Sequence, residues 1–370
     1  MNDDKFLKAE EISDVETKAV ERAFGAENRN RLIDKYFETC VKGLIAPENS
    51  WQHVYRLLLW SDPTTGLAHC YESDKSQPGK PWYARSLAFH DWLCRAFGVE
   101  PDELSQEIDW LFLKACSDLA DVMLRREAKL SEVAARQREP YGDRSFPEPG
   151  ADPELATLMQ ETLGPYLARE VEEDIWNALS QKIRQFLAVQ NKRKNLVGEG
   201  FEDVLAQIVR RACDVPEDSI RTRRLLYEIP GFNRARQGAK ENKVDLAIVR
   251  PTMRTLVTAK WSVRADREKQ FATEYDEYIN AESDNSKFQY VFVTNEFDPA
   301  RLMRACENLH RNSLMFDYVV HINPEAVRAA YGQGTVASAS ATSTQRRVIQ
   351  NIEAGRLISL EQWLRKLSVQ

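Results

Sequence analysis

The chain has 370 residues, of which 43% are hydrophobic and 29% are charged, and its formal net charge at pH 7 is −6. This length allows two domains and a sizeable core, whereas no run approaches the eighteen apolar residues of a membrane-spanning helix. The six cysteines have no CxxC spacing and the five histidines form no ligand pattern, which argues against a disulfide framework and a zinc site. The acidic start has no apolar segment of the kind found in secretory signals, so we expect a cytoplasmic protein.

The first part of the chain is predicted to be helical. Helical periodicity and helix-forming residues mark four segments, and a turn-rich connection separates the second from the third. The expected helices are 4–24, 29–45, 82–97 and 102–135, with the connection at 61–81. Prolines and glycines are concentrated at 136–152, which we interpret as a linker. We therefore expect an all-α N-terminal domain over residues 1–150.

The remainder, 151–370, is predicted to be an α/β domain with a mixed central sheet flanked by helices. One or two helices are expected at 153–190 and another from residue 200 onward. The later segments alternate between β-branched or aromatic runs and amphipathic runs. The expected strands are 223–229, 244–250, 255–263, 288–294 and 316–322, and the expected helices are 266–281, 298–310, 345–354 and 358–368.

Charge is unevenly distributed along the chain. Residues 182–267 hold 19 lysines and arginines against 10 acids, a net of +9, which leaves −15 for the rest. Such a basic segment in an acidic protein is typical of a phosphate-binding face. Four basic residues at or near the loop 230–243 are candidate phosphate contacts: Arg234, Arg236, Lys240 and Lys243.

The most informative segment is 258–274, which holds a lysine, an Arg-x-Asp-Arg cluster and a glutamate, with an aspartate fifteen positions before the lysine. These residues are Asp245, Lys260, Arg264, Asp266, Arg267 and Glu274. A lysine with two acids is the minimal set for metal-assisted phosphodiester hydrolysis. Arginine and aspartate are the side chains that recognise guanine and cytosine edges in the major groove. The segment therefore indicates both DNA cleavage and recognition of G·C pairs.

The expected strand geometry brings the candidate residues together. Side chains alternate along a strand, so Thr258, Lys260 and Arg264 share one face. The segment 250–254 contains a proline and fits a turn between two strands. The two strands would then form a hairpin that places Asp245 beside Lys260.

The pattern resembles the PD-(D/E)xK restriction endonucleases that cut sites containing CCGG. In that family a lysine is followed by Arg-x-Asp-Arg and, fourteen residues after the lysine, by a glutamate, and this chain has the same spacing. The family has a serine two positions before the lysine, and Thr258 stands there, so Glu274 would be the replacement acid. Asp245 matches the first acidic ligand, although Val244 replaces the usual proline. The resemblance covers about residues 195–325.

The resemblance implies a further glutamate on an upstream helix, for which Glu202 is preferred and Glu199 is the competitor. It also implies a prokaryotic type II restriction enzyme, in which Asp245, Glu274 and Glu202 would hold Mg²⁺ and Lys260 would stabilise charge on the phosphate. Arg264 and Arg267 would bind guanines and Asp266 would accept hydrogen bonds from cytosine amino groups. A homodimer, or a tetramer, would then read a palindromic CCGG and leave 5′ overhangs.

Two other functions fit the same residues. The first is a nuclease of the same superfamily that acts in repair or transposition with little sequence preference. The second is a DNA-binding protein of the same fold that does not cut. For the N-terminal helical domain, we expect dimerisation, regulation or an accessory DNA contact.

Overall fold

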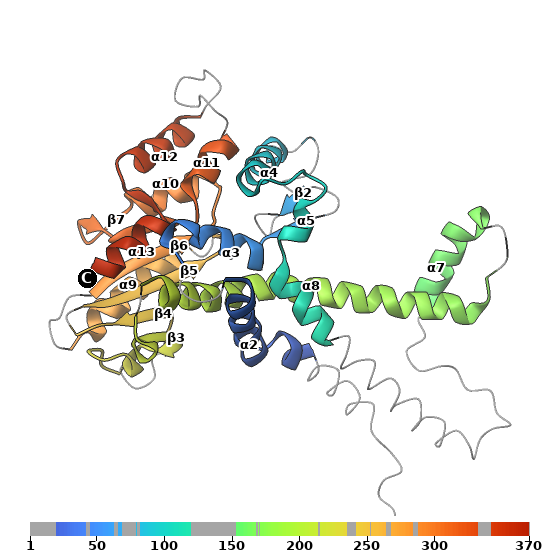
Figure 1. Ribbon diagram of the computed structural model, residues 1–370, viewed down its shortest axis with the longest axis horizontal. Coiled ribbons are helices and arrows are strands. Elements are labelled where there is room, and N and C mark those ends of the chain that lie inside the picture. Colours follow the sequence, from blue (N-terminus) through green and yellow to red (C-terminus); the bar gives the residue numbers. More distant parts are fainter. Residues whose placement is uncertain are drawn as a thin grey trace, which may run out of the picture. The chain divides into compact units, whose positions relative to one another are not determined.

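A six-stranded mixed sheet is the central element of residues 197–370 in the computed structural model of the chain (Figure 1). Its strand order is β10-β9-β6-β5-β4-β3. The strands are β3 Ile220–Leu225, β4 Lys243–Val249, β5 Arg254–Lys260, β6 Phe288–Thr294, β9 Tyr318–His321 and β10 Leu357–Ser359. The structure describes residues 20–41, 45–62, 66–68, 79, 82–119, 153–167, 169, 171–213, 215–234, 242–251, 253–263, 268–283, 288–331 and 342–369.

The sheet has a parallel half and an antiparallel half. Strands β10, β9, β6 and β5 are parallel neighbours, whereas β4 is antiparallel to both β5 and β3. Most of the residues of β5 and β6 are buried, as expected for central strands rich in β-branched and aromatic residues. The five strands expected from the sequence are confirmed with shifted ends. Strand β3 begins three residues earlier than expected and ends at Leu225, because residues 226–228 form a 3₁₀ turn, and β10 was not predicted.

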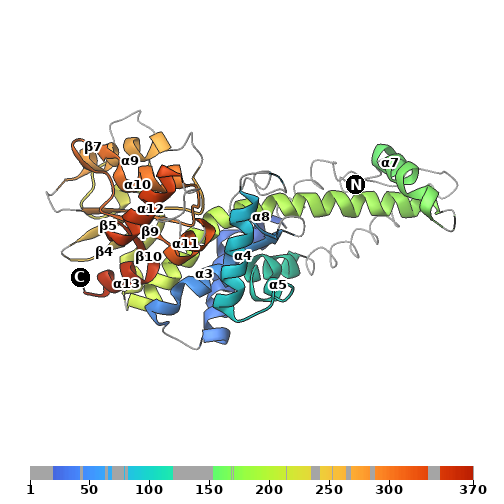
Figure 2. The same cartoon turned by 90° about the horizontal axis from the view of Figure 1, so that it is seen from above.

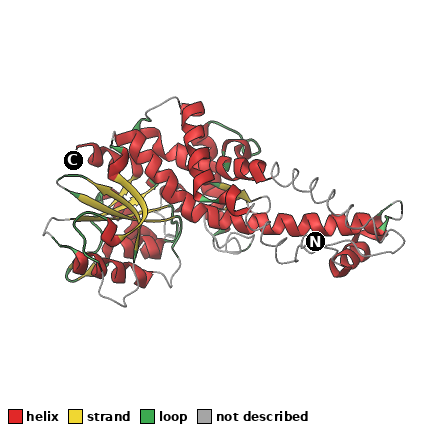
Figure 3. Ribbon diagram, turned by 90° about the horizontal axis from the view of Figure 1, so that it is seen from below, coloured by secondary structure: helices red, strands yellow, loops and turns green. Residues whose placement is uncertain are grey.

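Helices cover the sheet (Figure 3). They are the part of α8 Glu173–Cys213 from residue 197 on, α9 Glu268–Ala281, α10 Pro299–Glu307, α11 Pro324–Tyr331, α12 Ser343–Glu353 and α13 Leu360–Val369. The ring of Phe271 on α9 lies 5.3 Å from that of Phe292 on β6. The ring of Phe201 on α8 lies 5.4 Å from that of Trp261, the residue that follows β5. Burying each such ring contributes about 1.5–3 kcal/mol, so these contacts fix both helices against the sheet.

Several N-terminal elements precede the sheet in the chain. They are α2 Ala26–Tyr36, a π-helical turn Phe37–Val41, a 3₁₀ turn Pro47–Asn49, α3 Ser50–Leu58, α4 Tyr83–Phe97, α5 Leu104–Glu107 and helical residues 110–119. Helix α3 contacts α13 and α4 contacts α11 (Figure 2). The hydroxyl of Tyr55 on α3 donates to Asn295 Oδ1 at 2.9 Å, and the ring of Phe89 on α4 lies 4.8 Å from that of Phe297.

The N-terminal region is not wholly helical. Strands β1 Trp60–Asp62 and β2 Gly66–Ala68 form a short antiparallel pair, close to the start of the turn-rich connection expected at 61–81. Two residues of β1 and all of β2 fall inside that expected connection. The helices expected at 82–97 and 29–45 are observed, the latter over 26–36 with a π-helical continuation. The expected helix at 4–24 and the linker at 136–152 lie largely or wholly outside the described residues.

The chain divides into two compact units, one of residues 1–25 and 114–196 and the other of residues 26–113 and 197–370. In the first unit, α7 Pro153–Leu163 is followed by a 3₁₀ turn at Gly164–Tyr166 and by the first half of α8. Met159 on α7 and Trp176 on α8 belong to one apolar cluster. The domain boundary expected at residue 150 stays a prediction. Residues 26–113 belong to the same compact unit as the sheet.

Helix α8 is one continuous helix of 41 residues. The sequence predicted a new helix beginning near Gly198, but no proline interrupts 173–213, and isolated glycines in a helix cost only about 1 kcal/mol each.

The remaining short elements are β7 Leu309–His310, β8 Ser313–Leu314 and two 3₁₀ turns, Glu217–Ser219 and Leu226–Glu228. Within the described ranges, no helix has the length and apolar composition needed to cross a membrane.

Candidate active site

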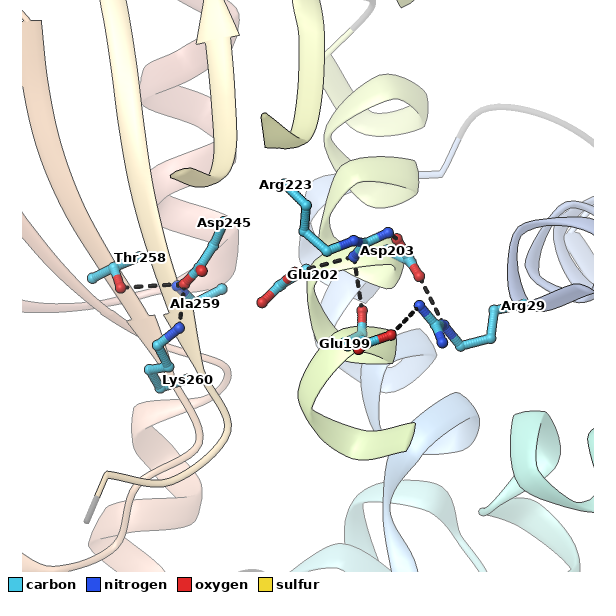
Figure 4. Close-up of polar contacts among 9 residues, drawn as sticks. All are labelled: Arg29, Glu199, Glu202, Asp203, Arg223, Asp245, Thr258, Ala259 and Lys260. Atoms are coloured by element: carbon cyan, nitrogen blue, oxygen red, sulfur yellow. Dashed lines mark hydrogen bonds and ion pairs between the residues drawn. The ribbon is translucent and has the colours of Figure 1, made fainter. Parts of the chain in front are cut away.

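Asp245 and Lys260 meet on the hairpin formed by β4 and β5. Lys260 Nζ donates to Asp245 Oδ2 at 2.6 Å, and the backbone N–H of Ala259 donates to the same oxygen at 2.9 Å (Figure 4). The hydroxyl of Thr258 donates to it at 3.3 Å. The predicted hairpin is therefore confirmed, and it fixes the aspartate through three donors from one strand. A buried acceptor that loses such donors costs about 1–3 kcal/mol.

Glu274 reaches the same region from α9. Its carboxylate accepts hydrogen bonds from Gln270 Nε2 at 2.8 Å and from the Tyr290 hydroxyl at 3.2 Å, and the residue is buried. Burial raises the pKa of Glu274, and the negative charge of Asp245 raises it further, while Lys260 and the two hydrogen bonds act in the opposite direction. Glu274 is thus an acid that interacts electrostatically with both Asp245 and Lys260.

Glu202 approaches from α8. It is buried, and its Oε2 lies 3.0 Å from Arg223 Nη1. Burial and then the charge of Asp245 raise the pKa of Glu202 from 4.5 to about 8, although Lys260 and Arg223 lower it. A carboxyl group with such a pKa is mostly protonated at pH 7 and half protonated near pH 8. Perturbation of this size is typical of functional sites, where like charges are held together.

Lys260 keeps its positive charge in spite of its burial. Burial lowers its pKa, but the carboxylates of Asp245, Glu202 and Glu274 together raise it above the ordinary value. The three acids on three different elements therefore act on a single ammonium group. Such a group can stabilise negative charge on a phosphate that enters the site.

Glu199, the competing candidate, has a different environment from Glu202. Its side chain is 62% exposed and its Oε2 lies 2.7 Å from Arg29 Nη2. It has no resolved electrostatic effect on Lys260, whereas Glu202 has one. The geometry therefore favours Glu202 as the member of this group of acids.

Two arginines and an aspartate beside Glu202 were not predicted. Arg223 Nη2 lies 2.5 Å from Asp203 Oδ1, and Arg29 Nε donates to Asp203 Oδ2 at 2.9 Å. Arg223 has a φ of 50°, and the β3–β4 ladder skips it although its neighbours pair with Leu246 and Val244. A left-handed conformation costs a non-glycine residue about 1–2 kcal/mol. Asp203 follows Glu202 directly, but nothing in the sequence indicates that Arg29, 174 residues away, would contact it.

The donor set suits a hard divalent cation in its chemistry. Asp245, Glu202 and Glu274 supply carboxylate oxygens, and the repulsion that raises the pKa of Glu202 and Glu274 would be relieved by a cation. In the described part of the chain, however, no three His, Cys, Asp or Glu residues are arranged closely enough to hold a metal. Asp245 Oδ2 is hydrogen-bonded to Lys260 instead. Mg²⁺ binding therefore stays a prediction that rests on the type of ligand.

The predicted base-reading residues Arg264, Asp266 and Arg267 lie outside the described residues, as do Arg236 and Lys240 among the predicted phosphate contacts. Helix α9 is described from Glu268, and the start expected at residue 266 lies outside the described residues. The other two predicted phosphate contacts, Arg234 and Lys243, have exposed side chains. The guanidinium of Arg234 lies 4.6 Å from the centre of the Tyr227 ring, and Lys243 is the first residue of β4.

Comparisons with known proteins give little further guidance. No family model matches the chain, and no curated protein has a similar sequence. One solved structure, "Metal-depleted Ecl18kI in complex with uncleaved, modified DNA", aligns over 98% of this chain and 85% of its own, with 13% identity and a TM-score of 0.36. A TM-score of this size is too low to carry over a fold or a function, so the function of this chain is inferred from its site.

Proposed function

We propose that this chain is a type II site-specific deoxyribonuclease that hydrolyses double-stranded DNA with Mg²⁺ at a palindromic site containing CCGG. The observation that supports it best is the direct contact between Lys260 and Asp245 at 2.6 Å, with the buried acids Glu202 and Glu274 both interacting electrostatically with this pair. Three acids that interact with one lysine suit the hydrolysis of a phosphodiester. Burying several charged groups costs free energy through desolvation. A protein that only binds DNA would gain nothing from this group of buried acids.

Each residue has a role that follows from its chemistry. Asp245, Glu274 and Glu202 would hold Mg²⁺, which lowers the pKa of a bound water when present. Lys260 donates hydrogen bonds toward the scissile phosphate and stabilises the charge that develops on it. Thr258 and the N–H of Ala259 keep the Asp245 carboxylate in place during the reaction.

The proposal extends to the residues that would recognise DNA. Arg264 and Arg267 would each donate two hydrogen bonds to a guanine, and Asp266 would accept from cytosine amino groups. Arg234, Arg236, Lys240 and Lys243 would contact phosphates. Two copies of the chain around a two-fold axis would read the four base pairs and leave 5′ overhangs. The protein would act in the cytoplasm of a prokaryote.

The direct test is a digest of unmethylated plasmid DNA by the purified protein, with Mg²⁺ and with EDTA, followed by sequencing of the ends. We expect discrete Mg²⁺-dependent fragments whose ends share CCGG. Nicks at random positions would support a nuclease of low specificity instead. Binding without cleavage on DNA rich in CCGG would favour a DNA-binding protein.

Lys260→Ala supplies the matched test of the site. Removal of one electrostatic stabiliser lowers a rate by about 10²–10³-fold, so we expect a loss of this size in single-turnover cleavage with little change in DNA binding measured in EDTA. Lys366→Ala is the control, since Lys366 is an exposed lysine that lies over the ring of Tyr318. Equal cleavage by the two variants would exclude the role assigned to Lys260.

A further inference from the structure

Arg223 lies at the junction between the candidate site and helix α8. It belongs to the edge strand β3, and its backbone is in the left-handed region with a φ of 50°. Its neighbours Thr222 and Arg224 pair with Leu246 and Val244, so Arg223 stands opposite Asp245 in the ladder without being paired to it. This local distortion lets the side chain cross to α8.

The guanidinium of Arg223 contacts one turn of α8 at three points. Nη1 lies 3.0 Å from Glu202 Oε2, Nη2 lies 2.5 Å from Asp203 Oδ1, and the backbone oxygen of Glu199 accepts from Nη1 at 3.4 Å. Glu202 lies between Arg223 and the Asp245–Lys260 pair (Figure 4). A planar guanidinium that spans two carboxylates fixes its partners in a way that a single ammonium cannot.

Asp203 is itself held from the opposite side. Its side chain is 1% exposed, and its second oxygen accepts from Arg29 Nε at 2.9 Å. Arg29 comes from α2 and is 3% exposed. If Asp203 turned away from Arg223, the buried carboxylate of Asp203 or the buried guanidinium of Arg29 would lose its partner. The loss of one partner of a buried ion pair is strongly unfavourable.

From this geometry we propose that Arg223 is a positioning residue that holds the carboxylate of Glu202 toward Asp245, and that Asp203 and Arg29 hold Arg223. The inference rests on the proposed function, in which Glu202 helps to hold the metal. The carboxylates of Glu202 and Asp245 repel each other. Without an anchor, Glu202 would rotate away from this region of negative charge. Arg223 anchors one of its oxygens and thereby keeps the pair of acids in place for a cation.

The test compares Arg223→Ala, Arg223→Lys and Asp203→Asn with the wild-type protein. Because a misplacement of about 1 Å can cost about 10²-fold in rate, we expect Arg223→Ala to lower single-turnover cleavage by about this factor. DNA binding in EDTA should stay unchanged. Arg223→Lys should recover part of the rate, and Asp203→Asn should lie between wild type and Arg223→Ala. Arg365→Ala is the matched control, since Arg365 also binds two carboxylates, those of Glu361 and Glu48, but on the exposed surface.

Calorimetric titration of the DNA-free protein with Mn²⁺ gives a readout besides activity. Loss of a positive charge by itself strengthens the attraction for a cation, whereas loss of the anchor weakens binding by about 10-fold. Weaker Mn²⁺ binding by Arg223→Ala therefore supports positioning. Unchanged or tighter Mn²⁺ binding would overturn it, as would weaker DNA binding in EDTA, because Arg223 would then be a DNA contact.

The two proposals fail in different ways. If the wild-type protein binds Mn²⁺ and cuts no DNA, the nuclease proposal is wrong, while the Mn²⁺ affinity of Arg223→Ala still decides the positioning role. If the wild-type protein binds no Mn²⁺, both proposals are wrong. Circular dichroism and thermal denaturation of each variant establish that it is folded, and Arg223→Lys and Asp203→Asn keep the test decisive if Arg223→Ala does not fold.

Discussion

Glu202 shows at the scale of one residue how a residue proposed to bind a metal makes the stability of the metal-free fold depend on pH. Burial and the charge of Asp245 raise its pKa to about 8, so the folded protein binds its proton more tightly than the unfolded chain does. Each pKa unit corresponds to about 1.4 kcal/mol. Glu202 therefore stabilises the metal-free fold below pH 4.5, and this contribution is lost as the pH rises through about 8.

We expect the metal-free protein to be less stable at pH 8.5 than at pH 6 by about 2–3 kcal/mol, and Glu202→Gln to remove most of this difference. The amide keeps the shape of the side chain but cannot ionise. The measurement is urea denaturation in EDTA at both pH values. Glu325→Gln, a change at an exposed glutamate of α11, is the control and should keep the wild-type dependence. A pH dependence of Glu202→Gln equal to that of wild type would show that other groups cause it.

At the scale of elements, the loop after β6 determines how the chain leaves β5. The side chain of Glu296 is 1% exposed, and its carboxylate accepts from the backbone N–H groups of Val263 at 2.8 Å, Phe297 at 2.9 Å and Asp298 at 2.8 Å. Asp298 in turn caps α10 through the N–H groups of Ala300 and Arg301. One buried carboxylate thus joins Val263, three residues after the end of β5, to the start of α10.

Glu296→Ala should lower the free energy of unfolding by at least about 3 kcal/mol, because each buried N–H left without an acceptor costs about 1–3 kcal/mol. Denaturant unfolding at pH 7 measures the loss. Glu325→Ala removes an exposed carboxylate that pairs with Arg328 at 3.1 Å, and it should cost no more than about 1 kcal/mol. Similar losses in the two variants would mean that water replaces the Glu296 carboxylate.

The sequence predicts the strands of the sheet well because β-branched and aromatic runs are local signals. It also predicts the hairpin that joins Asp245 to Lys260, since proline and short spacing specify a turn. It cannot predict that Arg223 adopts a left-handed backbone or that Arg29 reaches Asp203, because these contacts form only when distant elements pack. The sequence prefers Glu202 to Glu199 but keeps both as candidates, because residues three positions apart lie on nearly the same face of a helix and only the packing of α8 shows which of them is buried.

At the scale of the whole molecule, the proposed reading of CCGG requires symmetry. One set of Arg264, Asp266 and Arg267 would read two base pairs, so a four-base palindrome would need two chains. The basic segment 182–267, with a net charge of +9, would draw DNA to the reading side of each chain, while the rest of the molecule carries −15.

Sedimentation of the protein with a short duplex containing one CCGG should give two 42.6-kDa chains per duplex in Ca²⁺ or EDTA. The control is the same duplex with the central CG replaced by TA, which should bind more weakly and without fixed stoichiometry. Four chains on two duplexes would indicate the tetramer. One chain per duplex would contradict the symmetric reading of the site.

The contact of Arg29 with Asp203 limits how this protein can be shortened. A fragment that begins near residue 151 retains every proposed catalytic residue, yet it lacks α2, α3 and α4. It would leave the buried carboxylate of Asp203 with one arginine instead of two, and it would expose Trp261 and Phe297 where the rings of Tyr55 and Phe89 now cover them. Such a fragment would be a poor minimal enzyme. Helices that precede the proposed catalytic residues by more than a hundred positions thus support them, α2 through Asp203 and α3 and α4 through Trp261 and Phe297.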